Sequence, residues 1–268
     1  MSGWVPVADC DVTCVRAELA GRRVWVTART LLRATAAGLL LAVAPALMLP
    51  APGRARLARG YCRLMLRCLG VRITLSGGPI RNLSGVLVVS GHVSWVDVFV
   101  IGAVLPGRFV AKSEVVSWPG LGLLARLMRV IPIERANLRR LPDVVAAVAQ
   151  ALRAGQTVVA FPEGTTYCGV AYGRFRPALF QAAVDAERPV QPLRLSYHDR
   201  DGAPSTVAAY VGDDTLPASL RRLLAARRTL VRVDVGPLQL PRGDRRDLAG
   251  RCERAVRGAG RAGHALVA

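Results

Sequence analysis

Short apolar runs rich in β-branched residues alternate with helical segments from about residue 85 onward. They predict strands at Val86–Ser90, Phe109–Lys112, Val130–Ile133, Thr157–Phe161, Val190–Tyr197, Thr206–Val211 and Leu230–Val235. The clearest helix between them is Pro142–Ala154, and an arginine-rich helix is expected at Arg242–Gly258. Strands that are almost continuously apolar and alternate with helices are typical of sheets covered on both sides. The sequence therefore predicts an α/β fold whose mixed, largely parallel sheet carries helices on both faces.

An uncharged stretch of 20 residues, Ala34–Gly53, precedes this pattern. A helix of that length is about 30 Å long, which just spans the hydrocarbon core of a membrane. Pro45 and two further prolines interrupt it, so an unbroken helix is expected to end near Ala44. We expect this helix to dip into one leaflet, which makes the protein monotopic or single-pass.

The next stretch has an amphipathic pattern. Arginines recur on one helical face and apolar residues on another, namely Arg56, Arg59, Arg63 and Arg67 against Leu57, Tyr61, Leu64 and Cys68. Such a helix lies either at a membrane interface or against a protein core with a solvated basic face. The neighbouring uncharged stretch favours the membrane. We therefore expect an N-terminal membrane-associated segment at residues 1–75 and one catalytic domain at residues 76–268.

The charge of the chain requires an anionic partner. The formal net charge is +19 at pH 7, and every basic residue except Lys112 is an arginine. Apolar residues make up 52% of the chain, which favours an anionic membrane surface. Aromatic residues make up only 5%, and no nucleic-acid-binding motif is present, so nucleic acid is not expected as a partner.

The cysteines give little information by their spacing. The chain has six, at positions 10, 14, 62, 68, 168 and 252, without a Cys-x-x-Cys pair and with only three histidines. This inventory argues against a zinc site, so no metal is expected. We expect reduced thiols in a protein that faces the cytosol.

Polar residues stand where the predicted strands end. His92 and Asp97 follow the first strand, Lys112 ends the second, Arg135 follows the third and Glu163 follows the fourth. Ligands of open α/β sheets bind beyond the carboxyl ends of the strands. These side chains are therefore expected to converge on one site.

His92 and Asp97 form the strongest pair. Five residues apart, they would diverge by about 140° on a helix, but they can meet if His92 lies in a loop and Asp97 in the first helical turn. The carboxylate then accepts a hydrogen bond from one ring nitrogen, and the other nitrogen can take a proton from a hydroxyl group. A helix cap by Ser94 and Asp97 is the alternative, and it leaves His92 unexplained.

Four blocks of sequence resemble those of the 1-acylglycerol-3-phosphate acyltransferase (lysophosphatidate acyltransferase) family of glycerolipid acyltransferases. They are GHVSWVD at 91–97, with the family's His-x4-Asp, then VIPIER at 130–135, FPEGT at 161–165 and VQPL at 190–193. Two positions depart from the family pattern, since Gly91 replaces a common asparagine and Thr166 a frequent basic residue. These departures bear on the acceptor more than on the reaction.

The resemblance implies an acyltransferase of phospholipid biosynthesis at the cytoplasmic face of the inner membrane. A fatty acyl group would pass from acyl-coenzyme A or acyl carrier protein to the hydroxyl of 1-acylglycerol-3-phosphate, without a cofactor. Another lysolipid acceptor, such as a lyso-ornithine lipid, fits the same chemistry. A basic lipid-binding protein without enzymatic activity is the second class of function.

The resemblance also implies roles for single residues. His92 would be the general base and Asp97 its partner. Arg135 would bind the acceptor phosphate. Apart from the resemblance, Lys112 is the one lysine of the chain, and it is either a second contact to this phosphate or an ordinary surface lysine. Glu163 would accept a hydrogen bond from an acceptor hydroxyl group. In the same block, Gly164 would permit the tight turn, and Thr165 would cap the next helix.

Two side chains are rival nucleophiles. Ser94 lies only two residues from its base, and Cys168 has no histidine next to it in the sequence. The residues 118–128, together with Trp95, are candidates for lining an acyl-chain tunnel or for core packing.

Overall fold

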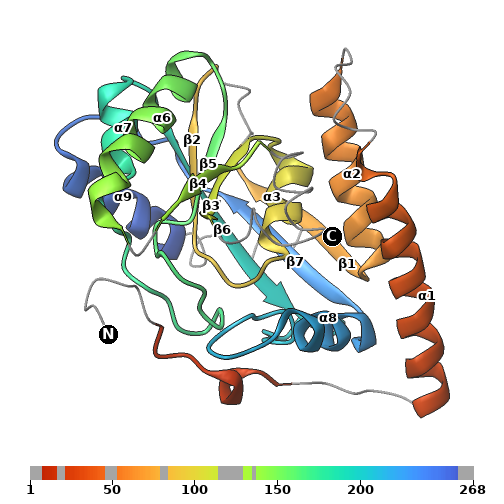
Figure 1. Cartoon of the computed structure of the whole chain (residues 1–268). Coiled ribbons are helices and arrows are strands. Elements are labelled where there is room, and N and C mark those ends of the chain that lie inside the picture. Colours follow the sequence, from red (N-terminus) through yellow and green to blue (C-terminus); the bar gives the residue numbers. More distant parts are fainter. Residues whose placement is uncertain are drawn as a thin grey trace.

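The computed structural model describes residues 8–16, 22–45, 53–78, 84–113, 129–134 and 137–258. Within them, a seven-stranded sheet has the order β1-β7-β6-β2-β5-β3-β4 (Figure 1). The strands are β1 (Val71–Gly77), β2 (Leu87–Ser90), β3 (Arg108–Lys112), β4 (Ile131–Ile133), β5 (Val158–Ala160), β6 (Val190–His198) and β7 (Thr229–Val235). Six of the seven predicted strands are confirmed to within one residue at each end.

The sheet is mixed and mostly parallel. Adjacent strands are parallel along the row β6-β2-β5-β3-β4. On the other side of β6, β7 is antiparallel to β6 and parallel to β1. The register places Ser90 beside Leu193 and Leu87 beside Val158, so β2 lies between β6 and β5. All four residues of β2 are buried, as expected for a central strand covered on both faces.

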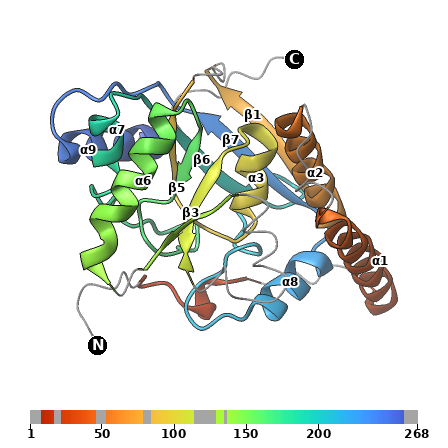
Figure 2. The ribbon, with the colours of Figure 1, turned by 45° about the horizontal axis from the view of Figure 1, so that its top comes forward.

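Helices cover both faces of the sheet (Figure 2). The described helices are η1 (Val12–Cys14), α1 (Arg23–Ala42), α2 (Arg54–Cys68), α3 (Asp97–Val104), η3 (Leu138–Arg140), α6 (Leu141–Arg153), α7 (Phe180–Asp185), α8 (Leu216–Ala225) and α9 (Arg245–Gly258). One apolar core lies between the sheet and α2, α3 and α8, and a second lies between the sheet and α6, α7 and α9. The predicted fold class is confirmed.

Two elements differ from the sequence prediction. The strand expected at Thr206–Val211 is wrong, because this segment is a loop whose backbone groups bond to other loops and to a side chain. Arg222 Nε and Nη2 donate to the carbonyl groups of Val207 and Ala209, in place of a neighbouring strand. Conversely, the sequence analysis does not predict β1, although apolar and polar residues alternate along this strand. β1 extends across residue 75, where the boundary between the N-terminal segment and the catalytic domain is expected.

α1 ends at Ala42, close to the predicted end near Ala44. It has no buried residue, and its outward face carries Val24, Trp25, Leu31, Leu32 and Leu39, each at least 63% exposed. In the described part of the chain, it is the one helix long and apolar enough to cross a membrane.

α2 packs against the domain with a different face from the one predicted. Its buried residues are Tyr61, Cys62, Met65 and Leu66, and α2 contacts α3 and β1. Leu57 and Leu64, expected on its apolar stripe beside Tyr61, are about half exposed. One face of α2 therefore covers the core, as in the alternative in which the helix lies against a protein core. Leu57 and Leu64 lie outside that core.

Two arginines of α1 point inward, to the C-terminal end of α8. Arg33 Nη1 donates to the carbonyl groups of Leu224 (2.9 Å) and Ala226 (2.7 Å), and Arg29 Nη2 donates to that of Ala225. The last carbonyl groups of a helix lack intrahelical partners and carry partial negative charge, so a guanidinium group is well suited to them. α1 thus presents cations to the protein and apolar residues to its surroundings.

We predict that Arg33→Ala lowers the free energy of unfolding by about 1–3 kcal/mol, because several carbonyl groups lose their donor. Arg23→Ala, at the exposed start of α1, is the matched control and should change it by less than about 0.5 kcal/mol. Denaturant unfolding of the detergent-solubilised protein measures both. Equal effects of the two substitutions would contradict this account of the contact between α1 and α8.

Candidate active site

The site forms at the carboxyl ends of two neighbouring strands. The loop with His92 follows β2, and the loop with Glu163 follows β5, which pairs with β2. The backbone N–H of His92 donates to Glu163 Oε2 (2.8 Å), and Asp97 Oδ2 lies 2.9 Å from His92 Nδ1. The predicted convergence of these three residues is confirmed.

The ring of His92 is oriented by Asp97. Asp97 is the first residue of α3 and is fully buried, and its Oδ2 also accepts hydrogen bonds from the backbone N–H of Val93 (2.8 Å) and Ser94 (2.9 Å). A carboxylate can only accept, so Nδ1 of His92 carries the hydrogen in this pair. The lone pair of the neutral ring then resides on Nε2.

The alternative interpretation of Ser94 and Asp97 as a helix cap is confirmed in part. The N-cap residue of α3 is Val96, and it makes no side-chain capping bond. However, Asp97 Oδ2 accepts from the N–H groups of Ser94 and Val93, and Ser94 Oγ accepts from Val96 N–H, so contacts of the capping-box type lie just before the helix. The carboxylate therefore shapes the His92 loop itself.

Sequence reasoning missed Tyr197. This tyrosine lies near the end of β6, is buried, and its hydroxyl group donates to Asp97 Oδ1 (2.5 Å). Burial, followed by the charge of Asp97, raises the pKa of Tyr197 well above its usual value, so the hydroxyl group keeps its proton. A tyrosine in an apolar strand gives no local signal of this contact, because the two residues are distant in sequence.

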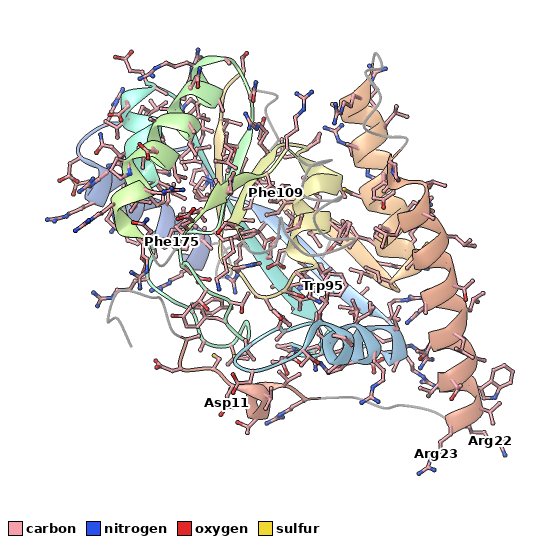
Figure 3. The ribbon with its side chains drawn as sticks, viewed as in Figure 1. Asp11, Arg22, Arg23, Trp95, Phe109 and Phe175 are labelled. Atoms are coloured by element: carbon pink, nitrogen blue, oxygen red, sulfur yellow. The ribbon has the colours of Figure 1, made fainter. Side chains whose placement is uncertain are left out.

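An aromatic side chain stacks on the imidazole ring of His92. His92 stacks on Phe161, with ring centroids 4.0 Å apart and planes 13° apart, and its side chain is 17% exposed. Phe161 in turn packs on Phe109 of β3, which is labelled in Figure 3. Stacking and the Asp97 contact together fix both the tilt and the direction of the imidazole ring.

Glu163 holds two loops together. It is 3% exposed; Oε2 accepts from His92 N–H and Oε1 accepts from Gly173 N–H (3.2 Å). Burial raises the pKa of Glu163 to about 7, although both backbone hydrogen bonds lower it. The left-handed backbone of Gly164 (φ +78°) confirms the predicted tight turn. A second role as acceptor for a substrate hydroxyl group stays a prediction.

One smaller expectation is wrong. Thr165 caps no helix, because the chain after it forms turns and irregular structure until α7 begins at Phe180. Thr166 instead donates its hydroxyl hydrogen to the carbonyl group of Tyr210, whose N–H donates to that of Val93 (3.0 Å). The loop at residues 206–211 thus supports the His92 loop from outside the sheet.

The expected phosphate ligands are described only in part. Lys112 is exposed at the end of β3, the second strand from β2. Arg135 lies outside the described residues, as does the segment 118–128. Trp95 is partly buried, and its Nε1–H donates to Ser219 of α8 (3.1 Å). This contact favours the core-packing interpretation of Trp95 (Figure 3).

The rival nucleophiles have other surroundings. Ser94 is fully buried, and its hydroxyl oxygen accepts a hydrogen bond from Val96 N–H (3.3 Å). Cys168 lies beside Cys10 and Cys14. The sequence analysis did not predict this cluster, because spacing in the sequence cannot show which loops meet.

This chain is similar in sequence to known proteins. The family model described as Acyltransferase matches residues 72–196. The 1-acyl-sn-glycerol-3-phosphate acyltransferase of Neisseria meningitidis serogroup B is 36% identical over 64% of this chain and 67% of that protein. The lyso-ornithine lipid O-acyltransferase of Pseudomonas aeruginosa is 36% identical over 77% of this chain and 79% of that protein. The chain belongs to the lysophosphatidate acyltransferase family.

The fold of this acyltransferase agrees with that of a solved structure. This chain superposes on the crystal structure of the 1-acyl-sn-glycerophosphate acyltransferase of Thermotoga maritima with a TM-score of 0.63 and 20% sequence identity. The match covers 89% of this chain and 95% of the Thermotoga maritima chain. This likeness confirms the fold class, and the sequence relatives confirm the family and the assignment as an enzyme of lipid metabolism.

We predict that Tyr197→Phe lowers kcat of the acyltransferase about ten-fold, or roughly 1.4 kcal/mol, because Asp97 loses the donor that fixes its second oxygen. The KM values should change little, and stability should fall by about 1–3 kcal/mol. Tyr172→Phe, whose exposed hydroxyl group bonds to Gly169 O, is the control. Steady-state kinetics of both variants test this; an unchanged kcat in Tyr197→Phe would contradict it.

Glu163 should also make stability depend on pH. Its pKa of about 7 in the folded state lies above the usual 4.5, so between these values the folded state binds more protons than the unfolded state. This contribution to stability is complete below about pH 4.5 and is lost as the pH rises to about 7. The total loss is about 3 kcal/mol.

Glu163→Gln removes this titration. Relative to that variant, the wild type should lose about 3 kcal/mol of unfolding free energy between pH 4.5 and pH 7.5. Denaturant unfolding at several pH values measures the difference, with the half-exposed Glu134→Gln as control. A difference between wild type and Glu163→Gln that stays constant with pH would show that Glu163 does not titrate in this range.

Proposed function

We propose that this protein transfers a fatty acyl group from acyl-coenzyme A or acyl carrier protein to the hydroxyl of 1-acylglycerol-3-phosphate, giving phosphatidic acid. One observation carries the proposal: Asp97 holds Nδ1 of His92 as a donor, so Nε2 is left as a base at the carboxyl end of the sheet. Family membership supports an acyltransferase rather than a lipid-binding protein without activity.

The chemistry follows from this base. Nε2 of His92 takes the hydroxyl proton while the hydroxyl oxygen attacks the thioester carbonyl carbon. The tetrahedral intermediate then expels the thiolate, which receives the proton from the imidazolium. Asp97 stabilises the positive ring between the two steps. A thioester is already activated, so neither an acyl-enzyme nor a cofactor is required.

The acceptor phosphate is assigned to basic side chains beyond the strands. Arg135 offers a planar fork for two phosphate oxygens, and Lys112, exposed at the end of β3, offers a second cation. Glu163, Gly164 and Thr165 would form the acceptor side of the site next to His92. The contact of Glu163 with the backbone of His92 supports this placement.

A lyso-ornithine lipid is the second candidate acceptor. The lyso-ornithine lipid O-acyltransferases of Pseudomonas aeruginosa and Rhizobium meliloti cover 77% and 88% of this chain, against 64% for the Neisseria meningitidis relative. These relatives support the lyso-ornithine lipid as an acceptor equally well, and the reaction at His92 is the same for both acceptors. The two acceptors differ at the head group, so one assay can separate them.

The same proposal places the protein on the cytoplasmic face of an anionic membrane. The outward face of α1 is apolar, which supports burial among acyl chains. Beside it, a groove of about 1040 Å³ between α1, α2 and β1 has a basic lining that includes Arg59, Arg63, Arg67 and Arg72. Cations next to an exposed apolar helix fit anionic head groups.

Thiol release from a long-chain acyl-coenzyme A tests the proposal. Purified protein in detergent should release coenzyme A only when 1-acylglycerol-3-phosphate or a lyso-ornithine lipid is present. The acceptor with the higher kcat/KM identifies the substrate. Acyl carrier protein as donor is the second arm.

His92→Ala and Asp97→Asn should each lower turnover by about 10²–10⁴-fold, because general-base catalysis is lost. His198→Ala is the matched control, since this histidine bonds only to Ser196 and Gly202 in the described residues. It should keep the wild-type rate. A His92→Ala variant with full activity, or no release with either donor and either acceptor, would overturn the proposal.

A further inference from the structure

Three cysteines from two distant segments meet beside the active-site loops. The Sγ atoms of Cys10, Cys14 and Cys168 all lie within 4.8 Å of one another. Cys10 and Cys168 are buried at 4% and 5% exposure, and Cys14 is half-buried. In Figure 1 the red N-terminal segment runs along the loop side of the sheet, where the chain after β5 meets it.

The local structure brings the first two thiols together. Asp11 caps the short helix η1 by accepting from Thr13 N–H (2.9 Å), and this turn returns Cys14 toward Cys10. The segment is held in place by Arg16 N–H, which donates to Thr206 Oγ1 (2.9 Å). A Cβ on Gly212 would lie 3.2 Å from the Cα of Asp11, so the N-terminal segment packs closely against the segment that contains Gly212.

Cys168 is surrounded by hydrogen-bond donors. Its Sγ accepts from the backbone N–H of Ala171 at 3.5 Å. The thiols of Cys10 and Cys14 lie within 4.8 Å of the same sulfur. Backbone N–H groups directed at a sulfur favour the thiolate, which is the form that binds metals.

We propose that Cys10, Cys14 and Cys168 bind one Zn²⁺ ion. Sulfurs that share a zinc ion at about 2.3 Å are roughly 3.8 Å apart, so the observed cluster needs shifts of about 1 Å at most. Three thiols lose their protons when the ion binds, and water takes the fourth position on the side of half-buried Cys14. Thiolates are soft ligands that select thiophilic cations over Mg²⁺ or Ca²⁺.

The ion would have a structural role. Next to Cys168, the backbone N–H of Tyr167 donates to the carbonyl group of His92 (2.8 Å). Zinc would therefore tie the N-terminal segment to the loop that holds the backbone of His92, without touching the reacting atoms. This inference does not depend on the acceptor or on the acyl donor.

Metal content and competition with a chromophoric chelator test the proposal on the full chain in detergent. Purified wild type should hold about one zinc per chain, and Cys14→Ser should bind Zn²⁺ at least ten-fold more weakly. Cys68→Ser is the matched control, since Cys68 is likewise half-buried but lies on α2. Zinc bound equally by Cys14→Ser, or not bound stoichiometrically by wild type at micromolar concentration, would overturn the proposal.

Two readouts stay valid if a variant fails to fold. Co²⁺ substituted into wild type should give intense sulfur-to-cobalt charge-transfer bands. Zn²⁺ should also protect Cys10, Cys14 and Cys168, but not Cys68, from alkylation. Fewer than six free thiols in the denatured, unreduced protein, with the missing pair among these three, would show a disulfide instead and would overturn the proposal.

Discussion

The buried carboxylate of Asp97 is the interaction on which the site depends. A fully buried carboxylate is tolerated only when its oxygens are hydrogen-bonded, and Asp97 accepts from His92, Val93, Ser94 and Tyr197. Three of these donors lie in the loop after β2 and the fourth lies near the end of β6, whereas Asp97 itself begins α3. Satisfying this one carboxylate therefore fixes the direction of the imidazole ring before substrate binds.

A second buried carboxylate completes the frame. Glu163 binds the backbone N–H of His92 and of Gly173, and Tyr167 N–H binds the carbonyl group of His92. β5 and β2 are adjacent and parallel, so their loops leave the sheet on the same edge and can make these contacts. Asp97 and Phe161 hold the ring of His92, and Glu163 and Tyr167 hold its backbone, which leaves Nε2 for chemistry.

Much of this arrangement was predictable because its causes are local. The short apolar runs predict six strands of the sheet correctly, and the short separation of His92 and Asp97 predicts that they meet across a loop and a helix start. Tyr197 and Cys168 were missed, because their partners are distant in sequence and no spacing rule connects them. Thr206–Val211 was predicted wrongly as a strand, because apolar composition reports burial, whereas its backbone is satisfied by Arg222 and by loops.

The central claim is that Asp97 holds His92 with the hydrogen on Nδ1 and the lone pair on Nε2. The chain has three histidines, so selective ¹⁵N labelling gives a simple spectrum, in which His92→Gln identifies the signals of His92. The measurement is the ¹⁵N spectrum of the detergent-solubilised protein at about pH 8, above the usual histidine pKa of about 6.5. We predict a protonated Nδ1 and an unprotonated Nε2. A His92 ring that carries its hydrogen on Nε2 would contradict the account.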